Sequence, residues 1–109
     1  MRSPIPANIA RALKRVPRLS ATEERDLLRR VRTGDTYARE RLVLSQLRFV
    51  IRMAGRYRRH GCPLPDLIQE GTVGLLEAIK RFNPDRGTRL STFAMWWIRS
   101  AMQDYVLRK

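Results

Sequence analysis

The sequence has only one cysteine and one histidine in 109 residues. Cys62 and His60 cannot supply a disulfide framework or a four-ligand zinc site, so we expect no metal and no cofactor. No stretch reaches the ~20 apolar residues of a membrane-spanning helix, and the start, residues 1–6, lacks the apolar run of a secretory signal. We therefore expect a cytoplasmic protein that has no membrane partner.

Acidic residues are also scarce, with ten against 23 basic residues and a net charge of +13. Of the basic residues 20 are arginine, whose planar guanidinium suits phosphate and stacking contacts. This balance favours a polyanionic partner, most often nucleic acid, with a membrane surface as the alternative. The sequence has no P-loop and no spaced Ser/His/Asp set, so we expect no enzyme.

The length leaves room for one domain with a modest core, and no segment alternates with period two long enough to predict a strand. We expect an all-α fold, a compact bundle of about four main helices after a basic N-terminal segment (1–18) with a short helical turn. The main helices are predicted near 21–33, at 36–59, from Asp66 to Phe82 and at 92–107. Ser20 with Glu23, Asp35 and Ser91 are the expected N-terminal caps.

The last predicted helix carries large residues on two faces. At ~100° per residue, one narrow face suits a core and contains Ala94, Ile98, Ala101 and Tyr105. The other face contains Phe93, Trp96, Trp97 and Ser100, with Arg86, Arg89 and Arg99 nearby. Aromatic planes among cations suit the stacking of unpaired bases. The alternative is that these aromatic residues pack against a neighbouring helix.

Two further surfaces are charged. Arginines spaced by seven, four, four and three residues form a basic stripe on the 36–59 helix: Arg41, Arg48, Arg52, Arg56 and Arg59. This stripe suits a phosphate track, unless it is solvated or pairs with Glu23, Glu24 and Asp26. The next helix has an acidic face with Asp66, Glu70 and Glu77, which favours a protein partner or solvent over nucleic acid. Gly71 and Gly74 in that helix predict a close approach of another backbone.

From about Leu19 to the C-terminus the sequence closely resembles the domain 2 of bacterial RNA polymerase sigma factors. The resemblance is carried by Asp66-Leu67-Ile68-Gln69-Glu70-Gly71, Gly74-Leu75-Leu76, Arg86-Gly87, Ser91-Thr92-Phe93-Ala94 and Trp96-Trp97-Ile98-Arg99. Asn83-Pro84 and residues 103–108 look most like the heat-shock branch of alternative sigma factors. The resemblance assigns residues 19–109 to sigma domain 2, truncated at its C-terminal end, as an excised fragment or a stand-alone domain.

The resemblance implies a role for each surface. Five positions match the sigma element that docks on the clamp coiled coil of the largest subunit of core RNA polymerase: Asp66, Gln69, Glu70, Thr72 and Leu76. Promoter DNA, as the non-template single strand, is expected at Arg86, Arg89, Phe93, Trp96 and Trp97, which hold a flipped adenine and the upstream edge of the bubble. Ser100 and Gln103 match positions that read the last upstream base pair, and Gln46 and Arg48 match a site for a second flipped base.

Thr88 and Leu90 depart from the family pattern, because primary sigma factors have aromatic residues at both positions. We expect weaker unaided duplex opening as a result. Two alternatives to the sigma reading are a helix-turn-helix regulator that reads intact duplex and a sigma-like decoy that binds an anti-sigma factor. The bulky aromatic start of the last helix disfavours the first alternative, since a recognition helix in the major groove is polar.

Overall fold

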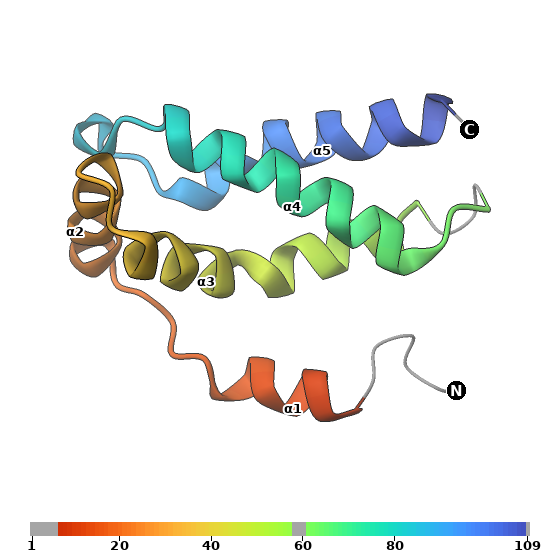
Figure 1. Ribbon diagram of the computed structural model, residues 1–109, viewed down its shortest axis with the longest axis horizontal. Helices are drawn as coiled ribbons and strands as arrows, with labels where there is room; N and C mark the ends of the chain where they lie inside the picture. Colours follow the sequence, from red (N-terminus) through yellow and green to blue (C-terminus); the bar gives the residue numbers. More distant parts are fainter. Residues whose placement is uncertain (1–6, 58–60, 109) are drawn as a thin grey trace.

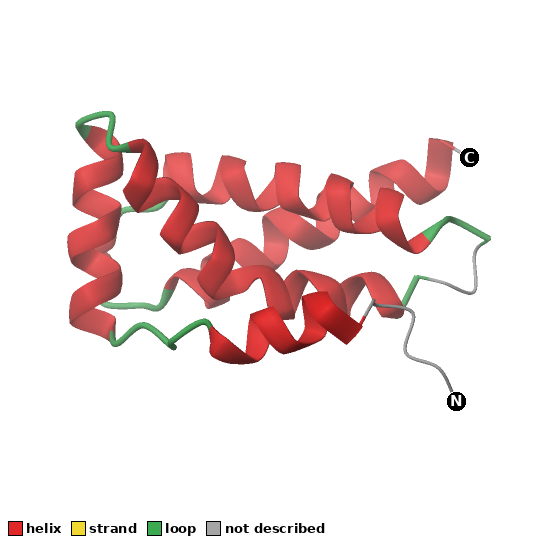
Figure 2. Ribbon diagram, turned by 60° about the horizontal axis from the view of Figure 1, so that its bottom comes forward, coloured by secondary structure: helices red, strands yellow, loops and turns green. Residues whose placement is uncertain are grey.

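The computed structural model describes residues 7–57 and 61–108, and all regular structure within these ranges is helical (Figure 2). The elements follow in the order α1 (Ala7–Arg15), α2 (Ala21–Arg32), α3 (Thr36–Gly55), α4 (Leu64–Arg81), the 3-10 turn η2 (Pro84–Arg86) and α5 (Leu90–Arg108). The predicted all-α bundle of four main helices with a short N-terminal one is therefore confirmed.

Local sequence signals set most of the helix ends. The Ser20 hydroxyl accepts a hydrogen bond from the Glu23 amide at 3.1 Å, and the Ser20 amide donates to the Glu23 carboxylate at 3.0 Å, which completes the predicted capping box. Asp35 caps α3 by accepting from the Ala38 amide at 3.0 Å. Pro63 precedes α4, and Asp66 lies in the first turn of this helix.

Two predicted helix ends are wrong. α5 begins at Leu90 rather than at residue 92, and Ser91 lies inside the helix. The Leu90 amide donates to the buried Glu24 carboxylate at 3.1 Å, so the cap comes from α2. The predicted helix 36–59 ends earlier, at Gly55, because the amide of Arg56 turns back to a carbonyl only three residues before it. Residues 58–60 lie outside the described residues.

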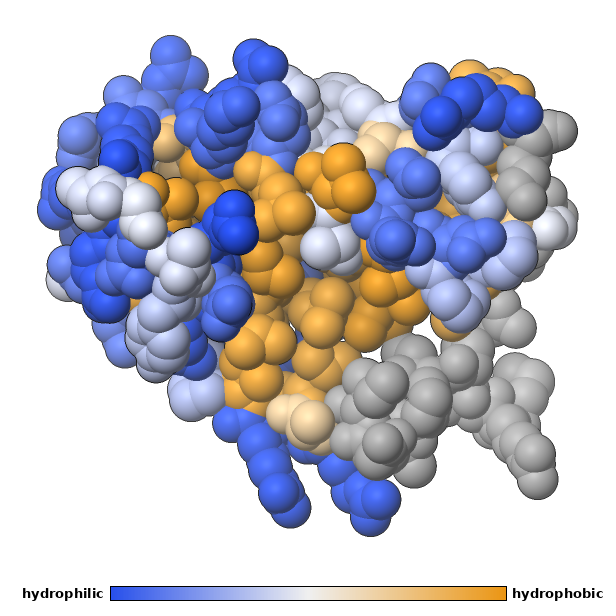
Figure 3. All heavy atoms as spheres, viewed as in Figure 1, coloured by the Kyte–Doolittle hydropathy of each residue, from blue (hydrophilic) through white to orange (hydrophobic). Residues whose placement is uncertain are grey.

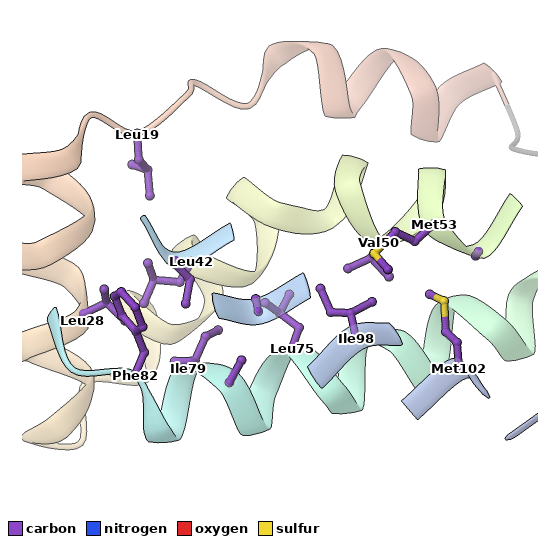
Figure 4. Close-up of a cluster of buried hydrophobic side chains, with 14 of the residues drawn as sticks. Leu19, Leu28, Leu42, Val50, Met53, Leu75, Ile79, Phe82, Ile98 and Met102 are labelled. Atoms are coloured by element: carbon purple, nitrogen blue, oxygen red, sulfur yellow. The ribbon is translucent and has the colours of Figure 1, made fainter. Parts of the chain in front are cut away.

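Helices α3, α4 and α5 run side by side, α2 crosses one end of them, and α1 lies along α3 (Figure 1). Figure 4 shows Val50, Leu75, Ile98 and Met102 pointing toward one another from these three helices, and all four are buried. Among the described residues, no helix has the length and apolar content that crossing a bilayer requires.

The backbones of α4 and α5 approach closely at Gly74. A Cβ atom at Gly74 would collide with the carbonyl oxygen of Trp97, whose carbonyl carbon would be 2.9 Å away. At Gly71 the nearest atom belongs instead to the flexible side chain of Met102. The predicted close backbone approach is thus confirmed at Gly74. This contact sets the position of the Trp97 backbone relative to α4.

Candidate nucleic-acid and protein interfaces

An aromatic cluster joins the end of α4 to the first half of α5. The Phe82 and Phe93 rings are 5.3 Å apart between centroids, and Phe93 and Trp97 are 6.3 Å apart. Phe82 is buried, Phe93 and Trp97 are half-buried against the core, and Trp96 is 64% exposed. The prediction that the three aromatic residues of α5 face outward holds for Trp96 and only in part for Phe93 and Trp97. Both of these rings pack against the core and remain partly exposed.

The cations beside this cluster differ from the predicted set. Arg99 lies over the Trp96 ring, with Cζ 5.7 Å from the centroid, as expected for a neighbour on the same helix. The cation over Trp97 is Arg81, at 4.8 Å, which the sequence did not single out because it comes from α4. Arg86 lies exposed on η2. Cation–ring contacts of this kind hold a guanidinium where a base and its phosphate would meet the protein.

Arg89 turns away from the aromatic cluster toward α2. Its Nε donates to the Glu24 carboxylate at 3.2 Å, and its Nη2 donates to the Leu19 carbonyl at 2.8 Å. The Glu24 side chain is only 3% exposed, and it holds both Arg89 and the first amide of α5. The sequence suggested Glu24 only as a partner for the arginines of α3, so its actual role was missed. The sequence likewise did not anticipate the hydrogen bonds of Arg89 to Glu24 and Leu19, while its assignment to DNA binding stays a prediction.

Gln46, Arg48 and Arg89 meet at a second site, a pocket of about 280 Å³ between α3, the start of α5 and the segment before α2. Its remaining lining residues are Arg18, Leu19, Ser45, Phe49, Arg52 and Ser91. Arg48 donates to the Val16 carbonyl at 3.4 Å, which ties the pocket wall to the end of α1. A pocket with four arginines and one aromatic ring suits a planar group that carries a phosphate.

The basic stripe of α3 is free of ion pairs in the part of the chain that the structure describes. Arg41, Arg52 and Arg56 form none with the acidic residues of α2, and Arg59 lies outside the described residues. Hydrogen bonds with Ser20 lower the pKa of the Glu23 carboxyl, and Arg41 is close enough for its charge to add to this lowering. The pairing is therefore limited to this long-range attraction, while a solvated face and a phosphate track both remain.

The acidic face of α4 is partly neutralised by neighbours. The Tyr105 hydroxyl donates to Asp66 at 3.0 Å, and Arg108 lies 3.9 Å from the Glu70 carboxylate. Arg81 donates to Glu77 at 2.7 Å, and this hydrogen bond lowers the pKa of Glu77 below its ordinary value. The acid-only face inferred from the sequence is therefore wrong in three dimensions, because α5 and the last turn of α4 supply basic and hydroxyl partners.

The other predicted docking residues lie along the outside of α4. Gln69 is exposed, Leu76 is 37% exposed, and the Thr72 hydroxyl donates to the Ile68 carbonyl at 2.7 Å. Two adjoining pockets of about 370 and 400 Å³ share Arg39 and Leu76. Their other lining residues are five apolar ones, Val31, Val43, Leu44, Val73 and Ile79, and five polar or charged ones, Arg32, Glu40, Thr72, Glu77 and Lys80. Figure 3 shows apolar side chains gathered over α3 and α4 on this face. An apolar groove with a charged rim suits a protein partner.

Ser100 and Gln103 are exposed on α5, beyond the tryptophan pair toward the C-terminus. Their amide and hydroxyl groups follow Trp96 along one side of the helix at spacings of four and seven residues. Both polar side chains are thus free to contact a partner that lies across Trp96.

Comparison with known proteins identifies the family of the chain. Residues 42–109 match the Sigma-70 region 2 family. The chain is 42% identical over 96 residues to the RNA polymerase sigma-C factor of Myxococcus xanthus, covering 88% of this chain and 32% of that protein. It is 44% identical over 97 residues to the RNA polymerase sigma factor RpoH of Rhizobium radiobacter and to that of Caulobacter vibrioides, covering 88% of this chain and 32% and 33% of those proteins. The chain thus spans about a third of the length of these curated relatives. It belongs to the Sigma-70 region 2 family of RNA polymerase sigma factors.

Proposed function

We propose that residues 19–109 act as sigma domain 2 in transcription initiation, docking on core RNA polymerase through α4 and capturing unpaired promoter bases on α5. The basic segment 1–18 precedes this unit and contains α1. The observation that carries the proposal is the aromatic cluster of Phe93, Trp96 and Trp97, with a guanidinium over each tryptophan. Such a cluster on a protein of +13 suits single-stranded nucleic acid.

In this proposal a flipped adenine of the non-template strand stacks at Phe93 and Trp97, and Trp96 meets the upstream edge of the bubble. Ser100 and Gln103 face the last base pair, and Arg86 holds the backbone. The pocket of Gln46 and Arg48 takes a second base. Unstacking a base costs a few kcal/mol, and stacking on an aromatic ring returns about 1–3 kcal/mol, so capture of open bases is favourable while unaided opening is not.

The docking half of the proposal places the clamp coiled coil of the polymerase on α4. Gln69 and Leu76 are exposed there, Glu70 and Thr72 are half-buried, and the apolar groove continues toward α3. Asp66 is held by Tyr105, so we assign it to shaping this surface as well as to contact.

Binding of a labelled non-template promoter strand and of its duplex tests base capture. We expect preference for the single strand, and losses of about tenfold with Phe93→Ala or Trp97→Ala, the size of one lost stacking contact. An abasic site at the flipped adenine should cause a similar loss. Leu107→Ala is the matched control, because this α5 side chain is 85% exposed and lies at the far end of the helix. Equal binding to duplex would overturn the proposal in favour of a duplex reader.

Capture of core polymerase on the immobilised domain tests docking. Glu70→Lys should abolish capture because it reverses a charge on the docking face. Asp26→Lys is the control, since it makes the same charge change on α2, where the side chain is 67% exposed. Retention of polymerase by Glu70→Lys, with a normal circular dichroism spectrum, would remove the docking assignment.

A further inference from the structure

The guanidinium of Arg81 covers part of the Trp97 ring and is held there by Glu77. We propose that Arg81 is a further DNA-binding residue of the aromatic site and that Glu77 is its positioning residue: the pair screens Trp97 in the free protein, and a DNA phosphate replaces Glu77 when a base stacks. This inference rests on the function proposed above, and it adds an internal competitor for the DNA phosphate to the site.

The geometry fixes the guanidinium from two directions. Arg81 Nε lies 2.7 Å from the Glu77 carboxylate one turn earlier on α4, and Cζ lies 4.8 Å from the Trp97 ring centroid on α5. The Arg81 side chain is 58% exposed, so its outer edge faces solvent, where a phosphate can reach it. Because the backbones of α4 and α5 touch at Gly74 and Trp97, the distance between guanidinium and ring is set by the helix packing.

The Trp97 ring therefore has two neighbours before any DNA arrives. Phe93 lies 6.3 Å away, and Arg81 occupies a further part of the ring surface. An incoming base must displace the guanidinium or stack upon it. In either case the phosphate of that nucleotide meets Arg81. A phosphate is a stronger acceptor for the guanidinium than a solvent-exposed carboxylate.

This exchange sets a cost on binding. Every strand whose phosphate takes Arg81 must break the Glu77–Arg81 pair and face the Glu77 charge. A strand that also offers a base gains the stacking contact, which outweighs the lost pair. Glu77 thereby lowers the affinity of the site for any strand, and the stacked base offsets this loss. An exposed ion pair four residues apart on a helix contributes little to stability, so its removal leaves the fold intact.

The first test uses the free protein. In a Trp96→Phe background Trp97 is the single tryptophan, because the chain has two. Glu77→Gln should raise the rate of acrylamide quenching of Trp97 fluorescence. Asp26→Asn is the matched control, since it removes the same charge from another pair spaced by four residues, with Arg30 at 3.7 Å on α2. Equal quenching in wild type and Glu77→Gln would overturn the screening role. No DNA is present, so this result is independent of the proposed function.

The second test measures affinity for the non-template strand. Glu77→Gln should bind about threefold more tightly, the size expected from one exposed pair and one exposed ring contact, and Asp26→Asn should change affinity by less than about 1.5-fold. Arg81→Ala should weaken binding and reduce the slope of log affinity against log salt by about 0.7, the value for one phosphate on a single strand. In Arg81→Ala the gain from Glu77→Gln should vanish.

Two outcomes would overturn the proposal. The first is an equal gain in affinity from Glu77→Gln and Asp26→Asn, which would mean that only the net charge of the protein matters. The second is a gain in affinity from Glu77→Gln that persists in Arg81→Ala. Failure of the proposed function has a different signature. Trp97→Ala would then bind the strand as the wild type does, whatever the quenching experiment shows.

Discussion

Replacement of Gly74 by alanine tests how α4 positions the aromatic site. Alanine is favoured over glycine inside a helix by about 1 kcal/mol, so propensity alone predicts stabilisation. The new Cβ would collide with the Trp97 carbonyl oxygen and lie 2.9 Å from its carbonyl carbon and 3.0 Å from the Ala101 Cβ. These are backbone and Cβ atoms that cannot move without separating the helices. Overpacking of this kind costs about 1–3 kcal/mol or more. After the propensity gain is subtracted, we expect a net destabilisation of up to about 2 kcal/mol, and each kcal/mol lowers the melting temperature by about 4–8 °C.

Two other glycines provide the controls for this prediction. At Gly71 a Cβ would collide with the terminal methyl group of Met102 and lie 3.0 Å from the Val50 side chain, which are side-chain rather than backbone atoms, so Gly71→Ala should cost less stability than Gly74→Ala in urea unfolding. At Gly55 nothing lies within 4 Å, and alanine should be neutral or stabilising by up to about 1 kcal/mol. Gly74→Ala should also weaken single-strand binding more than its stability loss explains, because Trp97 moves. Equal stability of Gly74→Ala and Gly55→Ala would refute the close-packing argument.

Three further predictions concern the caps and the start of α5. Glu24→Ala should destabilise the domain by about 2–3 kcal/mol in urea unfolding, because the amide of Leu90 loses its acceptor and Arg89 its carboxylate; a loss below about 0.5 kcal/mol would contradict the capping role. Hydrogen bonds from the Ala38 amide and then from Arg30 lower the pKa of Asp35 below 3.8, so its stabilisation is present at neutral pH and is lost as the pH falls through the lowered value. The urea midpoint of unfolding should therefore fall less between about pH 5 and pH 2 in Asp35→Asn than in the wild type. An equal fall in both proteins would contradict the role of Asp35. Leu90→Phe should lower the free energy of unfolding by about 1–3 kcal/mol without improving duplex opening, since Leu90 is fully buried. A variant that is as stable as the wild type and melts promoter DNA better would contradict this prediction.

Much of the fold was predictable because its signals are local. The capping box at Ser20 and Glu23 and the cap at Asp35 lie within four residues of the helices that they begin. Apolar spacing then identified the four main helices. The start of α5 could not be read in this way, since its acceptor, Glu24, is 66 residues earlier in the chain.

The candidate site was predicted less completely, for the same reason. Phe93 and Trp96 were found because they are neighbours on one helix, and helix geometry relates their directions. The contact of Arg81 with Trp97 and the pairing of Arg89 with Glu24 depend on how helices pack, which no spacing in the sequence reports. Thr88 and Leu90 likewise look equivalent in the sequence. The structure leaves Thr88 exposed and buries Leu90, so only position 88 is available to an aromatic residue that meets DNA.

The two adjacent tryptophans cannot serve the same purpose, because neighbouring residues on a helix point about 100° apart. Trp97 is half-buried, its carbonyl touches Gly74, and Arg81 covers its ring, so its position is set by α4. Trp96 is 64% exposed. Among the described residues, the one cation that lies over its ring is Arg99 of the same helix. A fixed ring suits the capture of one base in a defined orientation, whereas an exposed ring suits a contact that adapts to the end of a duplex. Trp96 can therefore vary without loss of fold, while any change at Trp97 alters both the packing of α4 on α5 and the site that this packing builds.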